Sequence, residues 1–122
     1  MITGTVNANL EPLIRVSVQD INGQEHQWDA VVDTGFNGWL TLRSDSILKL
    51  GLRWQRLGTA ILADGSQTLF DVYEVIVIWD GQLITIPVDE ADSEPLVGMS
   101  LMDGYELTIQ AINGGAITLR QI

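Results

Sequence analysis

The stretch that decides the fold reads Val31-Val32-Asp33-Thr34-Gly35-Phe36-Asn37-Gly38-Trp39-Leu40. Two apolar β-branched residues lead into an aspartate, and a second apolar segment begins at Trp39. This order predicts a carboxylate on a loop at the end of a buried strand. Gly35 lets the backbone approach a neighbour closely, and the Thr34 hydroxyl can satisfy backbone groups of the loop. We therefore take Asp33 as the candidate catalytic residue, supported by Thr34 and Gly35.

Length and composition predict one folded domain over residues 1–122. The chain is 46% hydrophobic and 18% charged, which is typical of a globular protein and not of a disordered one. Single domains commonly contain about 100 to 150 residues.

The charge balance argues against two classes of binding partner. Six basic against sixteen acidic residues give a net charge of −10, which opposes binding to nucleic acid and to anionic membranes.

The chain has no cysteine and one histidine, so it lacks the residues of a thiolate site, a Ser-His-Asp triad or a multi-histidine metal site. We predict no metal and no cofactor. Because no signal peptide is visible and cysteine is absent, we also predict a cytoplasmic location.

Asn-Gly and Asp-Gly pairs predict tight hairpin turns throughout the chain. They occur at 22–23, 37–38, 64–65, 80–81, 103–104 and 113–114. The segments between them are rich in alternating or β-branched apolar residues, which predicts strands at 2–6, 13–18, 27–32, 39–42, 59–63, 68–78, 83–88, 105–111 and 116–122. Ser44 or Asp45 is expected to cap a short helix that ends at Gly51. A second helical turn is expected at residues 99–103.

Two further polar features have ordinary explanations. The acidic run Asp89, Glu90, Asp92 and Glu94 lacks the glycine and spacing of a calcium-binding loop, so we interpret it as a solvated acidic loop. His26 lies in a polar stretch and is expected to be an exposed residue without a catalytic role.

An aspartate can carry out hydrolysis in a chain of this composition if it is paired with a second one. Two carboxylates held close together share a proton, so one can act as base while the other acts as acid. Such a pair can deprotonate a water molecule and protonate a peptide carbonyl without metal, thiol or imidazole.

Three segments resemble those of the retropepsin-like aspartic proteases, which include retroviral enzymes and stand-alone bacterial ones. The first is the apolar segment that ends in Asp33-Thr34-Gly35. The second is Ala63-Asp64-Gly65-Ser66, similar to the tip of the family's flap, a hairpin that covers the substrate. The third is Leu96-Val97-Gly98, similar to the segment that packs behind the catalytic loop. Together they extend over nearly the whole chain.

The resemblance implies a mostly β fold, a closed barrel with one or two short helices, and aspartic endopeptidase activity. The chain holds one Asp-Thr-Gly triplet, so the dyad must come from Asp33 of two subunits in a homodimer. A peptide or protein substrate would bind at Phe36, Asn37, Ala63, Asp64, Gly65 and Ser66, with hydrophobic side chains flanking the cut. The final segment, 116–122, is suited to a sheet shared between subunits.

The sequence departs from the retroviral pattern at two positions. Retroviral enzymes commonly carry an Asp and an Arg that form an ion pair where this chain has Asn37 and Met99. This leaves two alternatives open. One is a dimeric peptide-binding or scaffolding module that keeps the fold without hydrolysis, and the other is a structural β-domain of a larger assembly.

Overall fold

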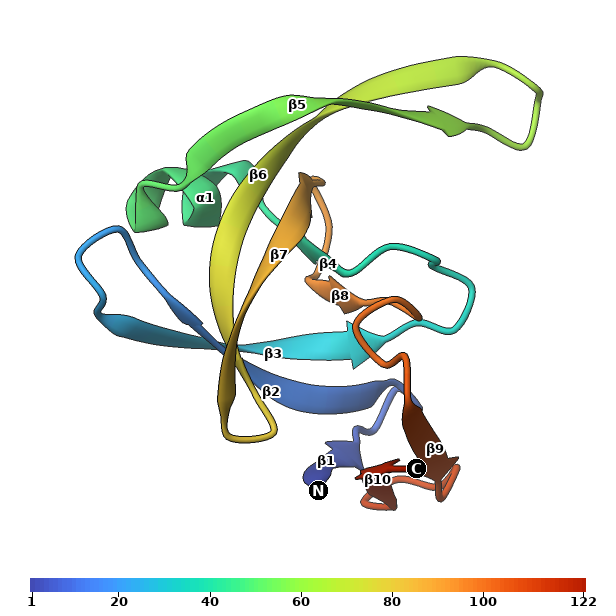
Figure 1. Cartoon of the computed structure of the whole chain (residues 1–122). Helices are drawn as coiled ribbons and strands as arrows, with labels where there is room; N and C mark the ends of the chain where they lie inside the picture. The colour runs from blue at the N-terminus through green and yellow to red at the C-terminus, as the bar shows by residue number, and fades with distance from the viewer.

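The computed structural model describes all of residues 1–122 and consists of ten strands and one helix (Figure 1). In chain order these are β1 (Ile2–Val6), β2 (Pro12–Gln19), β3 (Glu25–Val32), β4 (Leu40–Leu42), α1 (Ser44–Leu50), β5 (Arg53–Ile61), β6 (Gln67–Trp79), β7 (Gln82–Glu90), β8 (Leu96–Val97), β9 (Tyr105–Ile109) and β10 (Ala116–Gln121).

Six of the strands form a closed ring around the core. Their order is β6, β7, β4, β8, β3 and β2, and β2 also pairs with β6, opposite Ser17 to Gln19. In β2 the side chains of Ile14, Val16 and Val18 are buried while Arg15 is exposed, which is the period-two alternation of a strand with one face in the core. The β2–β6 pairing closes the ring, and burial of this alternating set stabilises it.

Helix α1 packs against the ring through Ile47 and Leu50, which are both buried. It ends at Gly51, whose φ of 68° is the predicted left-handed cap. Its N-cap is Arg43, without a side-chain capping bond, so neither Ser44 nor Asp45 is the cap. Residues 99–104 form hydrogen-bonded turns and no second helix, and Met102 N–H donates to the Gly98 carbonyl at 3.4 Å as in one helical turn.

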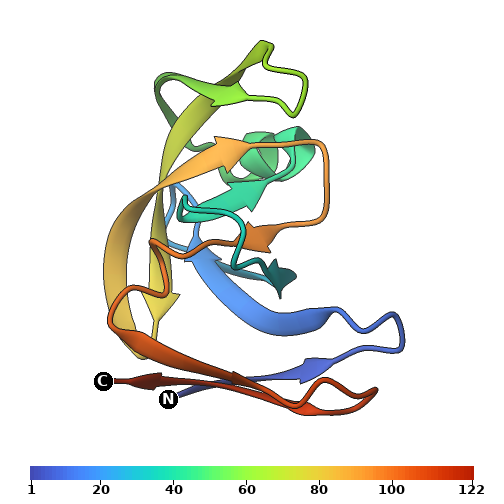
Figure 2. The ribbon, with the colours of Figure 1, turned by 90° about the vertical axis from the view of Figure 1, so that its right-hand side faces the viewer.

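The two ends of the chain lie side by side in a terminal sheet (Figure 2). Strand β10 pairs with β1 on one side and with β9 on the other. Segment 116–122 was expected to pair with a second subunit. Both edges of β10 are instead hydrogen-bonded within the chain, so this strand offers no free edge. The free edge of this sheet belongs to β9.

A long hairpin formed by β5 and β6 extends beyond the ring and over the loop that follows β3 (Figure 1). The strand predicted at 59–63 is therefore the end of a longer strand that begins at Arg53. The sequence showed no apolar alternation over Arg53 to Leu57 because these side chains are exposed on the hairpin.

Most of the predicted glycine turns are confirmed by positive φ angles, as at Gly65 (84°) and Gly81 (80°). The pair Asn37-Gly38 is an exception, because Gly38 does not adopt a positive φ. A Cβ at Gly38 would lie 2.5 Å from the ring of Phe36, so this glycine makes room for a side chain and does not form a hairpin turn.

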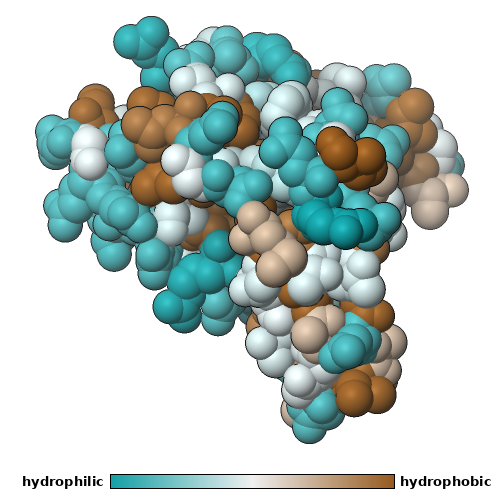
Figure 3. Space-filling view, turned by 60° about the horizontal axis from the view of Figure 1, so that its bottom comes forward, coloured by the Kyte–Doolittle hydropathy of each residue, from teal (hydrophilic) through white to brown (hydrophobic).

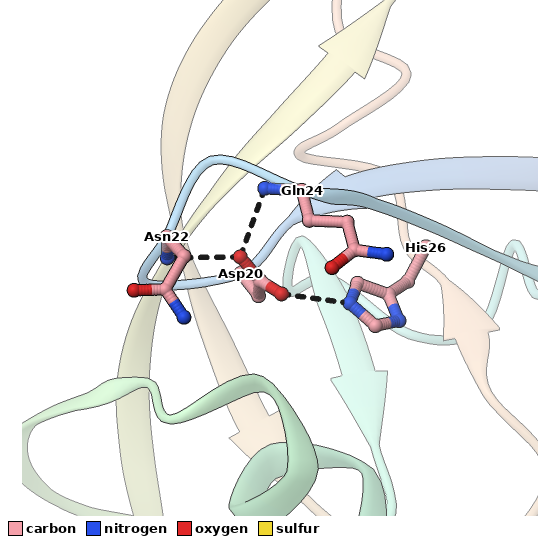
Figure 4. Close-up of polar contacts among 4 residues, drawn as sticks. All are labelled: Asp20, Asn22, Gln24 and His26. Atoms are coloured by element: carbon pink, nitrogen blue, oxygen red, sulfur yellow. Dashed lines mark hydrogen bonds and ion pairs between the residues drawn. The ribbon is translucent and has the colours of Figure 1, made fainter.

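His26 is less exposed than predicted. Its side chain is 18% exposed, stacks on Trp28 and lies 2.9 Å from Asp20 Oδ2 through Nε2 (Figure 4). Asp20 Oδ1 accepts hydrogen bonds from the backbone N–H groups of Asn22 and Gln24. The hydrogen bond with His26, followed by these backbone bonds, lowers the pKa of the Asp20 carboxyl. The pair therefore ties together the β2–β3 turn.

No helix of the structure has the length and apolar character needed to cross a membrane. On the face shown in Figure 3, hydrophobic side chains form separate patches among hydrophilic ones.

Candidate functional site

Asp33 is positioned by the parallel pairing of the last two residues of β3 with the two residues of β8. Val31 lies opposite Leu96 and Val32 opposite Val97. The Asp33 N–H then donates to the Val97 carbonyl at 2.9 Å, so the aspartate backbone is fixed one residue beyond the end of β3. Leu96 and Val97 thus lie beside the end of β3, next to Asp33.

The Asp33 carboxylate is held on one side only. Its Oδ1 accepts a hydrogen bond from the Gly35 N–H at 2.9 Å, and its own carbonyl accepts one from Phe36 N–H at 3.2 Å. Oδ2 has no hydrogen-bond partner within the chain, and the residue is partly exposed. The exposed Thr34 hydroxyl also has no partner within the chain. One carboxylate oxygen is therefore oriented while the other is free to meet a water molecule or a second carboxyl group.

The Asp33 loop (residues 33–39) is tied to the segment after β8 by backbone hydrogen bonds. Met99 N–H donates to Phe36 C=O at 2.8 Å, Ser100 N–H to Gly38 C=O at 3.1 Å, and Gly98 N–H to Trp39 C=O at 3.0 Å. The Ser100 hydroxyl adds a bond to the Asn37 carbonyl at 2.5 Å. These bonds join the two segments at the positions where the sequence lacks an Asp–Arg ion pair.

Gly98 makes this close approach possible. A Cβ there would overlap the Gly38 carbonyl oxygen and would lie 2.7 Å from Phe36 Cδ2. Gly98 is itself buried. The position therefore requires glycine for contact with the Asp33 loop and not for a positive φ.

The tip of the β5–β6 hairpin is a tight turn, as predicted. Gly65 N–H donates to the Leu62 carbonyl at 2.9 Å, and Ser66 donates to Asp64 Oδ1 through both its N–H and its hydroxyl. These two bonds, the hydroxyl first, lower the pKa of the Asp64 carboxyl. All residues from Ala63 to Ser66 are exposed, so the tip is free of packing contacts that would hold it still.

A groove of about 770 Å³ lies between the Asp33 loop and the hairpin. Its lining comes from three parts of the chain. The loop contributes Gly35, Phe36, Asn37 and Gly38, and the hairpin contributes Thr59, Ala60, Ile61, Thr68, Leu69 and Phe70. The rest of the lining consists of Thr41 from β4, Asp89 and Glu90 from β7, and Ala91, which follows β7. The structure therefore brings the predicted binding residues Phe36 and Asn37 together with the hairpin. The predicted tip residues Ala63, Asp64, Gly65 and Ser66 lie outside the lining of this groove.

The chain as a whole is similar in fold to a solved structure. No protein-family model matches the sequence, and a search of curated proteins finds no match either. The structure is similar to the crystal structure of a retropepsin-like aspartic protease from Rickettsia conorii, with a TM-score of 0.59 and 17% sequence identity. The similarity covers 99% of this chain and 90% of that one. The chain therefore has a retropepsin-like fold. The predicted fold class, mostly β with a short helix, is confirmed.

Two acidic residues of this retropepsin-like fold differ from the sequence interpretation. Asp89 and Glu90 belong to β7 and line the groove, so they are not part of a solvated loop. Burial is the main cause that raises the pKa of both carboxyls. No group of three or more His, Cys, Asp or Glu residues is arranged to hold a metal ion.

Sequence reasoning also missed two residues that support the Asp33 loop. Thr41 is 5% exposed, and its hydroxyl accepts a hydrogen bond from Leu96 N–H at 2.9 Å. The one polar residue in the apolar segment Trp39-Leu40-Thr41-Leu42 was the available signal, since a buried hydroxyl needs a partner. Ser100 gave no signal, because its partners are backbone carbonyls 62 to 63 positions away.

Proposed function

We propose that the protein is an aspartic endopeptidase whose dyad consists of Asp33 from two subunits of a homodimer. The observation that carries the proposal is the geometry of Asp33. One of its carboxylate oxygens is oriented by the Gly35 N–H, the other has no partner, and the adjacent loop lines a groove. The retropepsin-like fold supports the same assignment. A single chain holds one such aspartate, so a second copy must supply the other.

The chemistry follows from two carboxyl groups that share one proton. The ionised carboxylate removes a proton from a water molecule, and the oxygen of that water attacks the peptide carbonyl carbon. The protonated carboxyl gives its proton to the carbonyl oxygen, which yields a neutral diol intermediate. Collapse of the diol breaks the C–N bond, the nitrogen takes up a proton, and the dyad returns to its starting state.

The groove suits an extended peptide. The hairpin above and the Asp33 loop below both offer backbone groups, and main-chain pairing is how an added strand is held. Ile61, Leu69, Phe36 and Phe70 supply apolar lining for hydrophobic side chains near the cut. We place the protein in the cytoplasm as a one-domain enzyme with peptide or protein substrates.

The decisive experiment compares the wild type with Asp33→Asn in cleavage of a peptide library at several pH values. The variant is expected to keep its circular dichroism spectrum and its mass in solution but to lose cleavage by at least about a hundredfold, the size of a general acid–base contribution. Asp103→Asn is the control, because Asp103 is exposed and lies outside the groove. Undiminished cleavage by Asp33→Asn would rule out this mechanism.

A dimeric peptide-binding module is the second candidate, and one observation favours it. Asp33 is not among the residues that line the groove, so peptides have a place to bind that does not involve the carboxylate. Binding of library peptides without cleavage by a dimeric wild type, at every pH tested, would select this alternative.

A further inference from the structure

The groove between the hairpin and the Asp33 loop has a marked charge character. Of the residues that line it, two are charged, and both are acidic: Asp89 and Glu90. No lysine, arginine or histidine lines it. The remainder is apolar or uncharged, so the groove combines an apolar wall with a negative floor.

Asp89 has no partner that would explain its position. It lies on β7 opposite Val72 of β6 on one side and opposite Thr41 of β4 on the other. Its carboxylate accepts no hydrogen bond from the chain and is in no salt bridge. Arg56 is near enough to favour its ionised form, yet burial outweighs Arg56 and raises the pKa of the carboxyl.

Glu90 adds a second negative group beside it. Glu90 lies next to Asp71 of β6, and Trp54 Nε1–H donates to Asp71 Oδ1 at 3.0 Å. Burial, then the charge of Asp71, disfavours the ionised form of Glu90. The groove therefore holds two partly desolvated carboxyl groups, and the nearby Arg56 does not outweigh the burial of Asp89. A cation bound in the groove relieves this cost of burial.

We propose that Asp89 is a specificity-determining residue and that the groove selects peptides carrying a lysine or arginine side chain, whose charge pairs with Asp89 beside Glu90. This inference rests on the proposed function, because it names the substrate class of the same groove. The aliphatic stem of such a side chain fits the apolar wall formed by Ile61, Leu69 and Phe70 while its charged end reaches the floor. The net charge of −10 draws cationic peptides toward the molecule.

Binding to Asp33→Asn tests the proposal without interference from cleavage. Fluorescent ten-residue peptide pools are made in which one position at a time is fixed as lysine, arginine, norleucine or glutamate, and their affinities are measured by anisotropy. Norleucine matches the lysine stem but carries no charge. At one position, the lysine and arginine pools are expected to bind about tenfold more tightly than the norleucine pool, as for a charge-assisted contact.

Three variants in the Asp33→Asn background assign the preference to Asp89. Adding Asp89→Asn is expected to reduce it to less than about threefold, and adding Asp89→Lys to replace it with a preference for glutamate. Adding Asp103→Asn changes the net charge equally at an exposed site outside the groove, so it is expected to keep the tenfold preference. Equal binding of all pools, no binding of any pool, or a preference that survives Asp89→Asn would overturn the proposal.

Cleavage by the wild type separates this inference from the proposed function. A lysine and arginine preference in binding, together with no cleavage by the wild type, would refute the endopeptidase and leave the groove's selectivity standing. Cleavage that Asp33→Asn abolishes, without any preference for basic residues, would do the reverse.

Discussion

At the scale of single residues, the site depends on the missing side chain of Gly98. Gly98→Ala places a methyl group where the Gly38 carbonyl and the Phe36 ring already lie, and a backbone oxygen cannot turn aside as a side chain can. We expect a loss of about 3 kcal/mol in the free energy of unfolding, the upper part of the usual range for overpacking. Urea denaturation measures it, with cleavage assayed under conditions where the variant is folded.

Gly23→Ala is the matched control for that substitution. Gly23 has a φ of 80° and open space around it, so alanine meets backbone strain alone, about 1 kcal/mol. We expect Gly23→Ala to leave cleavage unchanged and Gly98→Ala to lower it, because only Gly98 contacts the Asp33 loop. Equal effects of both substitutions on cleavage would contradict the role assigned to Gly98.

Asp89 yields a stability prediction with a definite sign. Burial raises the pKa of its carboxyl in the folded state above the ordinary value of 3.8, so folding favours the protonated form. That stabilisation is complete below pH 3.8 and is lost as the pH rises through the folded pKa. Asp89→Asn cannot ionise, so we expect a higher Tm than the wild type at pH 7. Thermal unfolding from pH 3 to pH 7 measures the difference, which should vanish at the acidic end.

A lower Tm of Asp89→Asn at pH 7 would mean that Arg56 stabilises the Asp89 carboxylate more than burial opposes it. The expected gain fits a residue kept for binding, since groups at functional sites often reduce stability.

The sequence placed Asp89 in a solvated run because its neighbours are acidic. Its burial depends on β4 and β6, which approach it from 48 and 17 positions away, and no local pattern records that. Asp33 could be proposed from the sequence because its signal, an apolar strand followed by Asp-Thr-Gly, is local.

At the scale of elements, the tip of the β5–β6 hairpin is exposed, so a substitution there can alter its local order without unfolding the ring. Asp64→Ala removes the acceptor of both Ser66 hydrogen bonds at its tip. Because the tip is exposed, we expect the free energy of unfolding to change by no more than about 0.5 kcal/mol. Amide hydrogen exchange at Gly65 and Ser66 is expected to become faster, while exchange in β6 near Val75 and Val77, which are buried, stays the same.

Peptide affinity tests whether that turn matters for binding. If the hairpin closes over a peptide, a looser tip costs ordering entropy and weakens binding by a few-fold. Asp103→Ala, also an exposed aspartate but outside the hairpin, is the control. Faster exchange at the tip with unchanged peptide affinity would limit the hairpin's role to its strands, Thr59 to Ile61 and Thr68 to Phe70, which line the groove.

The elements that sequence patterns revealed are those whose own residues alternate. Strands β2, β3, β6 and β7 have a buried face within the ring and were predicted within a few residues. Strand β8 was not predicted as a strand, because its two residues pair with β3 and β4 and carry no period of their own. The Asn37-Gly38 pair was misread as a hairpin turn, since dipeptide chemistry cannot distinguish a turn from a space left for the Phe36 ring.

At the scale of the whole molecule, the paired terminal sheet changes what a dimer interface can use. Strand β10 is hydrogen-bonded on both sides within one chain, so two subunits cannot share a sheet through it without breaking these pairs. Exposed backbone edges remain on β9 and β5. A dimer must therefore form through surfaces that leave the monomer fold intact, which predicts subunits that exchange without unfolding.

Subunit exchange gives a direct test of the shared dyad. When wild type and Asp33→Asn are mixed in equal amounts and allowed to exchange, random pairing leaves about a quarter of the dimers with two aspartates and about half with one. Because a dimer with one aspartate has no second carboxyl to share a proton, we expect the activity per wild-type chain to fall to about half of its unmixed value. Asp103→Asn, mixed in place of Asp33→Asn, keeps Asp33, so the activity divided by the total number of chains should stay at the wild-type value. The samples must have a mass of twice 13.4 kDa, and a tagged chain verifies that subunits have exchanged. If the activity per wild-type chain then stays constant at every ratio of Asp33→Asn, each subunit works alone.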